Sequence, residues 1–130
     1  MSSESVSMKT LPEFDGKQSN FGYWWGKFVA YLNVKSLSHV ITAAFKDLLP
    51  TTESAASTRV EKEAVKENTL VVGLFGIVIT GAALLRKIEK MKSPEWPNGC
   101  GYLIADMMLT KYRPNDILSL GDQKTKLLEL

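Results

Sequence analysis

The stretch TLVVGLFGIVITGAALL, residues 69–85, decides how the rest of the chain is interpreted, because its 17 residues carry no charge. A helix that spans a bilayer needs about 20 apolar residues, so this length leaves a membrane anchor open. Thr80 and Gly81 interrupt the run, and Thr80 is a good N-cap for a helix that begins with GAALL. Each half is then too short to cross a membrane. The preferred interpretation is the buried central helix of a bundle.

Outward from this stretch, the chain divides into helices separated by Pro, Gly and polar breaks. Residues 55–79 form one long helix, although VVGLFGIVIT also has the β-branched content of a buried strand. Asn20 is the expected cap of the first helix and Asp116 of the last, while Ser36 or Ser38 caps a short helix between. The predicted helices cover 21–34, 36–45, 55–79, 81–92, 101–112 and 116–130. The sequence therefore predicts an all-α fold, a compact orthogonal bundle of about five to six helices.

The first helix carries an apolar stripe whose spacing lines one helical face: Phe21, Trp25, Phe28 and Leu32. Large aromatic side chains on such a stripe usually fill a core, so we assign Trp25, Phe28 and Trp96 to stability. A second set on the same helix is a candidate assembly contact, because its glycines let another backbone approach: Gly22, Trp24, Gly26 and Tyr31.

Length and charge describe an ordinary intracellular domain. The chain has 130 residues, about one domain, and its 16 basic and 14 acidic side chains leave a net charge of +2. This balance gives no electrostatic footprint for nucleic acid. The lone Cys100 rules out an intramolecular disulfide, and the polar start MSSESVSMKT is not a signal peptide. We expect a cytosolic or nuclear protein.

The residues needed for catalysis or metal binding are almost absent. One histidine, His39, and one cysteine cannot supply a zinc site or a Cys-His or Ser-His-Asp arrangement. Cys100 lies between glycines in NGCGY, without a cationic neighbour to lower its pKa. The glycine-rich pieces match neither the dinucleotide fingerprint nor the phosphate loop. We therefore expect no catalytic site, cofactor, metal or small-molecule substrate.

A basic cluster follows the apolar stretch, and two interpretations of it stay open. It consists of Arg86, Lys87, Lys90 and Lys92. Cations at the end of a helix offset its dipole, which is the preferred interpretation. Contact with RNA phosphates is the alternative, but aromatic residues that would stack on bases are absent nearby.

Two blocks of the sequence resemble the Gag proteins of copia-type LTR retrotransposons. The first is LPEFDGKQSNFGYWWGKFVAYL, where a Phe-x-Gly turn precedes an aromatic helix; the matching residues are Phe14, Gly16, Phe21, Trp24, Trp25, Phe28 and Tyr31. The second is residues 95–130, where a tryptophan precedes a helix ending in Lys-Tyr-x-Pro and then a leucine-spaced helix. Its matching residues are Trp96, Gly99, Leu103, Lys111, Tyr112, Pro114, Asp116, Leu120 and Leu127. The likeness spans residues 11–130 and is nearest to elements of unicellular algae and other microbial eukaryotes.

The resemblance implies a retroviral capsid-like N-terminal lobe over residues 11–115, after a tail at 1–10. Residues 116–130 would be a final helix or the start of a second lobe. Such proteins self-assemble as rings or shells, forming cytoplasmic virus-like particles around the element's RNA, with nuclear access open. RNA binding would reside mainly in regions outside this chain. Two alternatives remain: a domesticated Gag-derived adaptor that binds a protein partner, and a small membrane protein anchored by residues 69–85.

Overall fold

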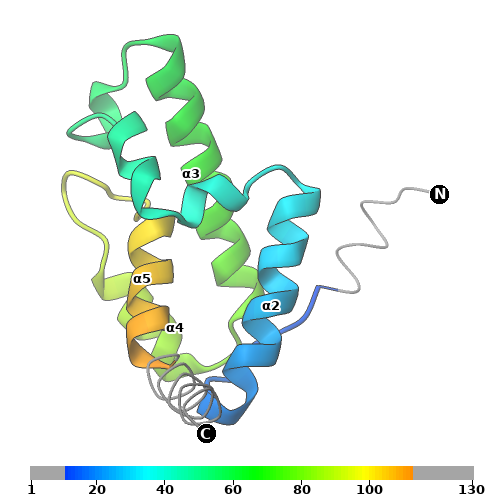
Figure 1. Ribbon diagram of the computed structural model, residues 1–130. Helices are drawn as coiled ribbons and strands as arrows, with labels where there is room; N and C mark the ends of the chain where they lie inside the picture. The colour runs from blue at the N-terminus through cyan, green and yellow to red at the C-terminus, as the bar shows by residue number, and fades with distance from the viewer. Residues whose placement is uncertain (1–10, 113–130) are drawn as a thin grey trace, which may run out of the picture.

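Residues 11–112 are described in a computed structural model, and within them the chain is built from helices (Figure 1). In chain order, the α-helices and short 3-10 helices (η) are α2 (Gln18–Val34), η1 (Ser38–Ile41), η2 (Ala43–Leu48), η3 (Glu53–Ala55), α3 (Arg59–Val78), α4 (Ala82–Lys90) and α5 (Gly101–Lys111). This part of the chain has no strand, although Phe14 and Ile79 form an isolated β-bridge. The predicted all-α fold is confirmed. The predicted helix over 116–130, with its expected cap Asp116, lies outside the described residues, and so does Pro114 of the motif.

Helix α3 continues unbroken into the apolar stretch and ends at Val78. The strand interpretation of VVGLFGIVIT is therefore wrong. It begins at Arg59 rather than Ala55 because Thr58 caps it. The Thr58 hydroxyl accepts from the Glu61 N–H at 3.0 Å, and the Glu61 carboxylate accepts from the Thr58 N–H at 3.1 Å. The Ser57 N–H also donates to the Glu61 carboxylate, at 3.0 Å, and the backbone hydrogen bonds from Ser57 and Thr58 lower the pKa of Glu61. None of the helices in residues 11–112 is both long and apolar enough to span a membrane.

The break between α3 and α4 is held by the extended segment that precedes α2. The Phe14 N–H donates to the Val78 carbonyl at 2.8 Å, and the Thr80 N–H donates to the Phe14 carbonyl at 3.0 Å. The Thr80 hydroxyl also donates to that carbonyl, at 3.2 Å, and makes no cap bond. The predicted Thr80 cap is therefore wrong, and Gly81 occupies the cap position of α4 instead.

Helix α2 starts earlier than the sequence suggested, at Gln18, so Asn20 lies inside its first turn and does not cap it. The Asn20 amide donates to Asp15 Oδ2 at 2.9 Å, and Asp15 Oδ1 accepts from the Lys17 N–H at 2.9 Å. The predicted turn at Gly16 is confirmed by its φ of +90°.

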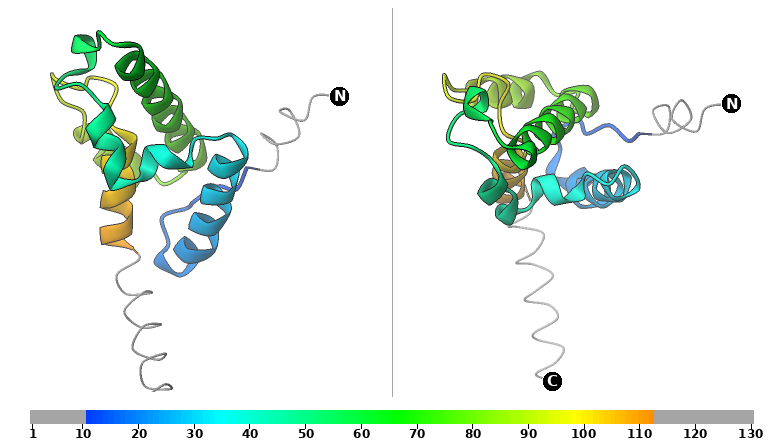
Figure 2. Two further views of the ribbon diagram at one scale, coloured as in Figure 1. Left: turned by 45° about the horizontal axis from the view of Figure 1, so that its top comes forward. Right: turned by 90° about the horizontal axis from the view of Figure 1, so that it is seen from above.

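The predicted helix over 36–45 is replaced by the two 3-10 turns η1 and η2. Ser36 has a φ of 60°, in the left-handed region, so the helical backbone ends there. It does not cap a new helix, because a cap residue typically has an extended backbone. Element η1 contacts α2, α3 and α5 and so joins the three long helices near one end of the bundle. Figure 2 shows this crossing of the short elements over the helices from two further directions.

The core is a cluster of aromatic rings from α2, α3 and the ends of the described chain. Phe14 contacts Phe21 at 5.5 Å and Tyr112 at 5.0 Å between ring centroids, both edge to face. Phe28 meets Phe75 of α3 at 4.9 Å. The predicted core stripe is confirmed, since its four members are at most 7% exposed: Phe21, Trp25, Phe28 and Leu32. Phe14 and Tyr112 of the proposed motif are buried with them.

Candidate interaction surface

The two residues best suited to chemistry, His39 and Cys100, have different surroundings. His39 Nε2 lies 3.0 Å from Glu67 Oε1, and its ring meets the edge of Phe45. Cys100 is buried; desolvation, aided by the nearby Glu53 carboxylate, raises the pKa of its thiol to about 11. The thiol is therefore protonated at neutral pH and a poor nucleophile. Within residues 11–112 no three His, Cys, Asp or Glu side chains gather as metal ligands would.

Asn68 is a structural residue whose role the sequence did not reveal. It is fully buried on α3, and its amide donates to the Gly99 carbonyl at 2.9 Å. Its Oδ1 accepts from the Gly101 N–H, at the first residue of α5, at 2.7 Å. The side chain therefore fixes the start of α5 against α3. The available signal was a single polar residue directly before a charge-free run.

Trp24 does not form an exposed edge, so this part of the predicted assembly contact is wrong. It is 2% exposed, stacks on Phe14 and Phe28 at 5.0 Å each, and its Nε1 donates to the Pro12 carbonyl at 3.0 Å. The reason is that the extended segment before α2 covers this side of the helix. The spacing of residues within one helix cannot predict that another segment covers it.

The other three residues of that predicted contact lie on different parts of α2. Gly22 and Gly26 are exposed on its outer side, next to Tyr23, which is 74% exposed. A Cβ added at Gly26 would meet nothing within 4 Å. Tyr31 is half-buried, with Lys35 Nζ 5.8 Å from the centroid of its ring. Tyr31 lines a hollow together with residues of α3, and neither Gly22 nor Gly26 is among the residues that line it.

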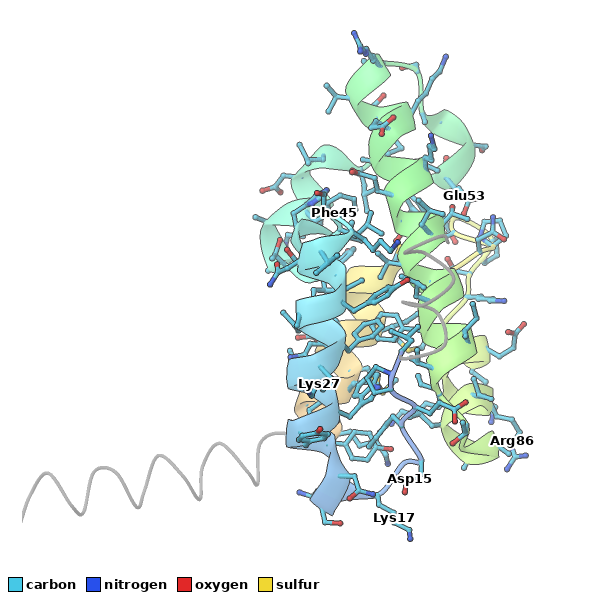
Figure 3. All side chains as sticks on the ribbon, turned by 90° about the vertical axis from the view of Figure 1, so that its right-hand side faces the viewer. Asp15, Lys17, Lys27, Phe45, Glu53 and Arg86 are labelled. Atoms are coloured by element: carbon cyan, nitrogen blue, oxygen red, sulfur yellow. The ribbon has the colours of Figure 1, made fainter. Side chains whose placement is uncertain are left out.

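An apolar groove lies between the second half of α2 and the second half of α3. Figure 3 shows the side of the molecule on which these two helices lie next to each other. The groove has a volume of about 480 Å³. Its lining residues are Tyr31, Lys35, Leu37, Thr69, Leu70, Gly73, Leu74 and Ile77. We call this surface the α2–α3 groove. Lys35 is the sole charged residue among those that line it.

The α3 side of the groove is apolar yet open to solvent. Leu70 is 51% exposed and Ile77 is 55% exposed, although both belong to the charge-free run of the sequence. Gly73 lies between them, and a Cβ added there would meet nothing within 4 Å. Exposed apolar side chains that gather in one hollow mark a contact surface more often than isolated ones do. The α2–α3 groove is therefore the candidate functional site.

The predicted basic cluster is a surface feature of α4 and the turn after it. Arg86, Lys87 and Lys90 are exposed, while Lys92 Nζ pairs with Glu89 Oε2 at 2.9 Å. Lys87 also shares a hollow of about 300 Å³ with Lys111, at the end of α5. The charges of the cluster are accessible, but that of Lys92 is partly compensated.

Two further motif residues, Trp96 and Leu103, lie outside the core, although their place in the motif suggested a core role. Trp96 is half-buried, and its Nε1 donates to the Thr51 carbonyl at 3.3 Å, so it anchors one loop on another. Leu103 is 41% exposed, because the core face of α5 is formed by its neighbours Ile104 and Met108. Leu103 instead lines a separate hollow of about 390 Å³ beside Lys46.

Comparisons with protein-family models, with curated proteins and with solved structures found no match to this chain. Its function therefore has to be argued from its own residues.

Proposed function

We propose that this chain is a structural protein: the first capsid-like lobe of a Gag-type protein that self-assembles into rings or shells around retrotransposon RNA. The observation that carries the proposal is the α2–α3 groove, an apolar surface that the fold leaves open. Two side chains of this groove, Leu70 and Ile77, are more than half exposed and contribute little to the core. Supporting it are the resemblance of residues 11–130 to copia-type Gag proteins and the all-α architecture.

Contacts with RNA are proposed to be secondary in this chain. The accessible cations on α4 are Arg86, Lys87 and Lys90, and Lys111 extends them. A handful of exposed cations gives weak, salt-sensitive binding to phosphates without selecting a base sequence. In the proposed particle these residues add to RNA binding by regions outside this chain.

One observation also supports the adaptor alternative. A groove between two helices, lined by aliphatic side chains, is a surface into which an amphipathic helix of another protein can bind. In that case the α2–α3 groove would hold a foreign helix, and the chain would stay monomeric by itself.

Self-association against concentration distinguishes these two functions. The full 130-residue chain is measured by static light scattering and negative-stain electron microscopy while protein and salt concentrations are raised. We expect monomers at micromolar concentration and ordered assemblies when many copies are crowded, because modest contacts multiply when many act together. Monomers under every condition, together with tight binding to a single host protein, would contradict assembly and favour the adaptor.

A further inference from the structure

The exposed face of α3 has the pattern of a surface that packs against its own copy. Leu70 and Ile77 project on either side of Gly73, roughly 10 Å apart along the helix at 1.5 Å per residue. The midpoint between the two side chains falls next to Gly73. When two such helices lie antiparallel, Leu70 of each copy reaches Ile77 of the other, with Gly73 near the axis.

We infer that the α2–α3 groove binds a second copy of this chain, through a two-fold, antiparallel contact between two α3 helices centred near Gly73. A two-fold contact uses the same patch on both copies, so the patch must complement itself. Here the two projecting side chains, Leu70 and Ile77, supply the knobs, and the missing side chain of Gly73 lets the backbones approach. This inference rests on the proposed self-assembly and identifies one contact within it, because a two-fold contact alone stops at a dimer and rings or shells need a second contact elsewhere.

Charge supports a second copy as the occupant. Residues 69–85 carry no charge, so the apolar halves of two α3 helices can meet without desolvating an ion of either helix. The one charged residue that lines the groove, Lys35, lies on its α2 side. The antiparallel order brings Lys66 of one copy beside the C-terminal end of the other copy's α3, where the helix dipole favours a cation. Lys66 is exposed and forms no ion pair within residues 11–112.

The extent of this face sets the expected strength. The uncharged half of α3 within the helix, 69–78, is about three turns long. A contact of that size falls below the roughly 1,200 Å² that stable interfaces bury. We therefore expect a weak dimer, with a dissociation constant of about 10⁻⁴ M or higher. Such a contact becomes effective only where many copies are held together.

Two glycines on the same helix provide a matched pair of variants. Gly73 and Gly76 are both exposed, both helical, and both have open space where a Cβ would be, but only Gly73 lines the groove. Gly73→Glu introduces two like charges that face each other across the axis, whereas Gly76→Glu introduces the same charge beside the groove. Both substitutions replace glycine by a better helix former, so the thermal midpoint of each variant should not fall.

Sedimentation equilibrium of the 130-residue chain, from about 10 µM to 1 mM, covers the range of the weak affinity expected for this contact. We expect Gly73→Glu to weaken self-association at least tenfold, and Gly76→Glu to associate like the wild type. A mixture of Gly73→Glu with Gly73→Lys should form a heterodimer at least as readily as the wild type dimerises, because opposite charges then meet at the axis.

The outcomes separate this inference from the proposed function. A wild type that assembles while Gly73→Glu assembles equally well overturns the α3 contact and leaves self-assembly standing. The same conclusion follows if Gly76→Glu loses association as strongly, or if the mixed variants remain monomeric. A wild type that remains monomeric up to about 1 mM, or a groove that binds a helix of another protein instead, overturns both.

Discussion

The two faces of the apolar half of α3 have similar side chains and opposite surroundings. Val71, Phe75 and Val78 are at most 1% exposed and pack into the aromatic core. On the other face, Leu70 and Ile77 are more than half exposed. Burial in the core explains why Val71, Phe75 and Val78 are apolar. Folding of this chain does not explain in the same way why Leu70 and Ile77 are apolar. The comparison teaches that burial in the core accounts for the apolar residues on one face of this helix only, and the other face is the one that we propose for contact.

The largest expected effect comes from exchanging one residue on each face for alanine. Phe75→Ala should lower the free energy of unfolding by about 3–5 kcal/mol, because it removes a buried ring in contact with Phe28. Ile77→Ala, two residues along the same helix, should change it by about 0.5 kcal/mol or less. Urea unfolding followed by circular dichroism measures both. Equal losses would show that the two faces are not different after all.

The second effect concerns the polar residue on the buried face. Asn68→Ala leaves the Gly99 carbonyl and the Gly101 N–H without their partner, at a cost of about 1–3 kcal/mol for each group. Thr69→Ala is the matched control, because the Thr69 hydroxyl is exposed and bonds only within its own helix, to the Val65 carbonyl at 3.0 Å. A thermal melt of Asn68→Ala like that of the control would mean that α5 does not depend on this bridge.

Smaller effects are expected from glycine substitutions, where the sign matters more than the size. Gly73→Ala should stabilise the chain by about 0.5–1 kcal/mol, since its φ is helical and a Cβ meets nothing within 4 Å. Gly16→Ala should destabilise it, because Gly16 has a φ of +90° that alanine adopts only with strain. Chemical denaturation of both variants tests this difference, and a stabilised Gly16→Ala would contradict the described turn.

Patterns within one segment predicted much of the fold. The spacing of Phe21, Trp25, Phe28 and Leu32 identified a buried helical face, since periodicity depends only on residues of that helix. The long helix ending near Ile79 and the helix beginning at Gly101 were likewise visible. Each of these features depends on local geometry, which a single sequence contains.

Features that depend on distant residues could not be predicted in this way. Trp24 is buried because the Pro12 segment covers it, and Thr80 is engaged by the Phe14 carbonyl, 66 residues away in the chain. The predicted assembly contact used residues of α2 alone, whereas the groove is lined by residues of α3 as well. Leu70 and Ile77 lay within a stretch interpreted as wholly buried, and their exposure follows only from how the helices pack.

The most direct test of the central claim, that the exposed face of α3 serves contact rather than folding, is one double variant. Leu70→Ser with Ile77→Ser removes the apolar character of that face and leaves the buried face intact. Sedimentation equilibrium and a thermal melt are recorded on the same samples of wild type and variant. The account predicts self-association at least tenfold weaker, with a free energy of unfolding changed by no more than about 1 kcal/mol for the two surface sites. Unchanged self-association, or a loss of stability comparable to that of Phe75→Ala, would contradict it.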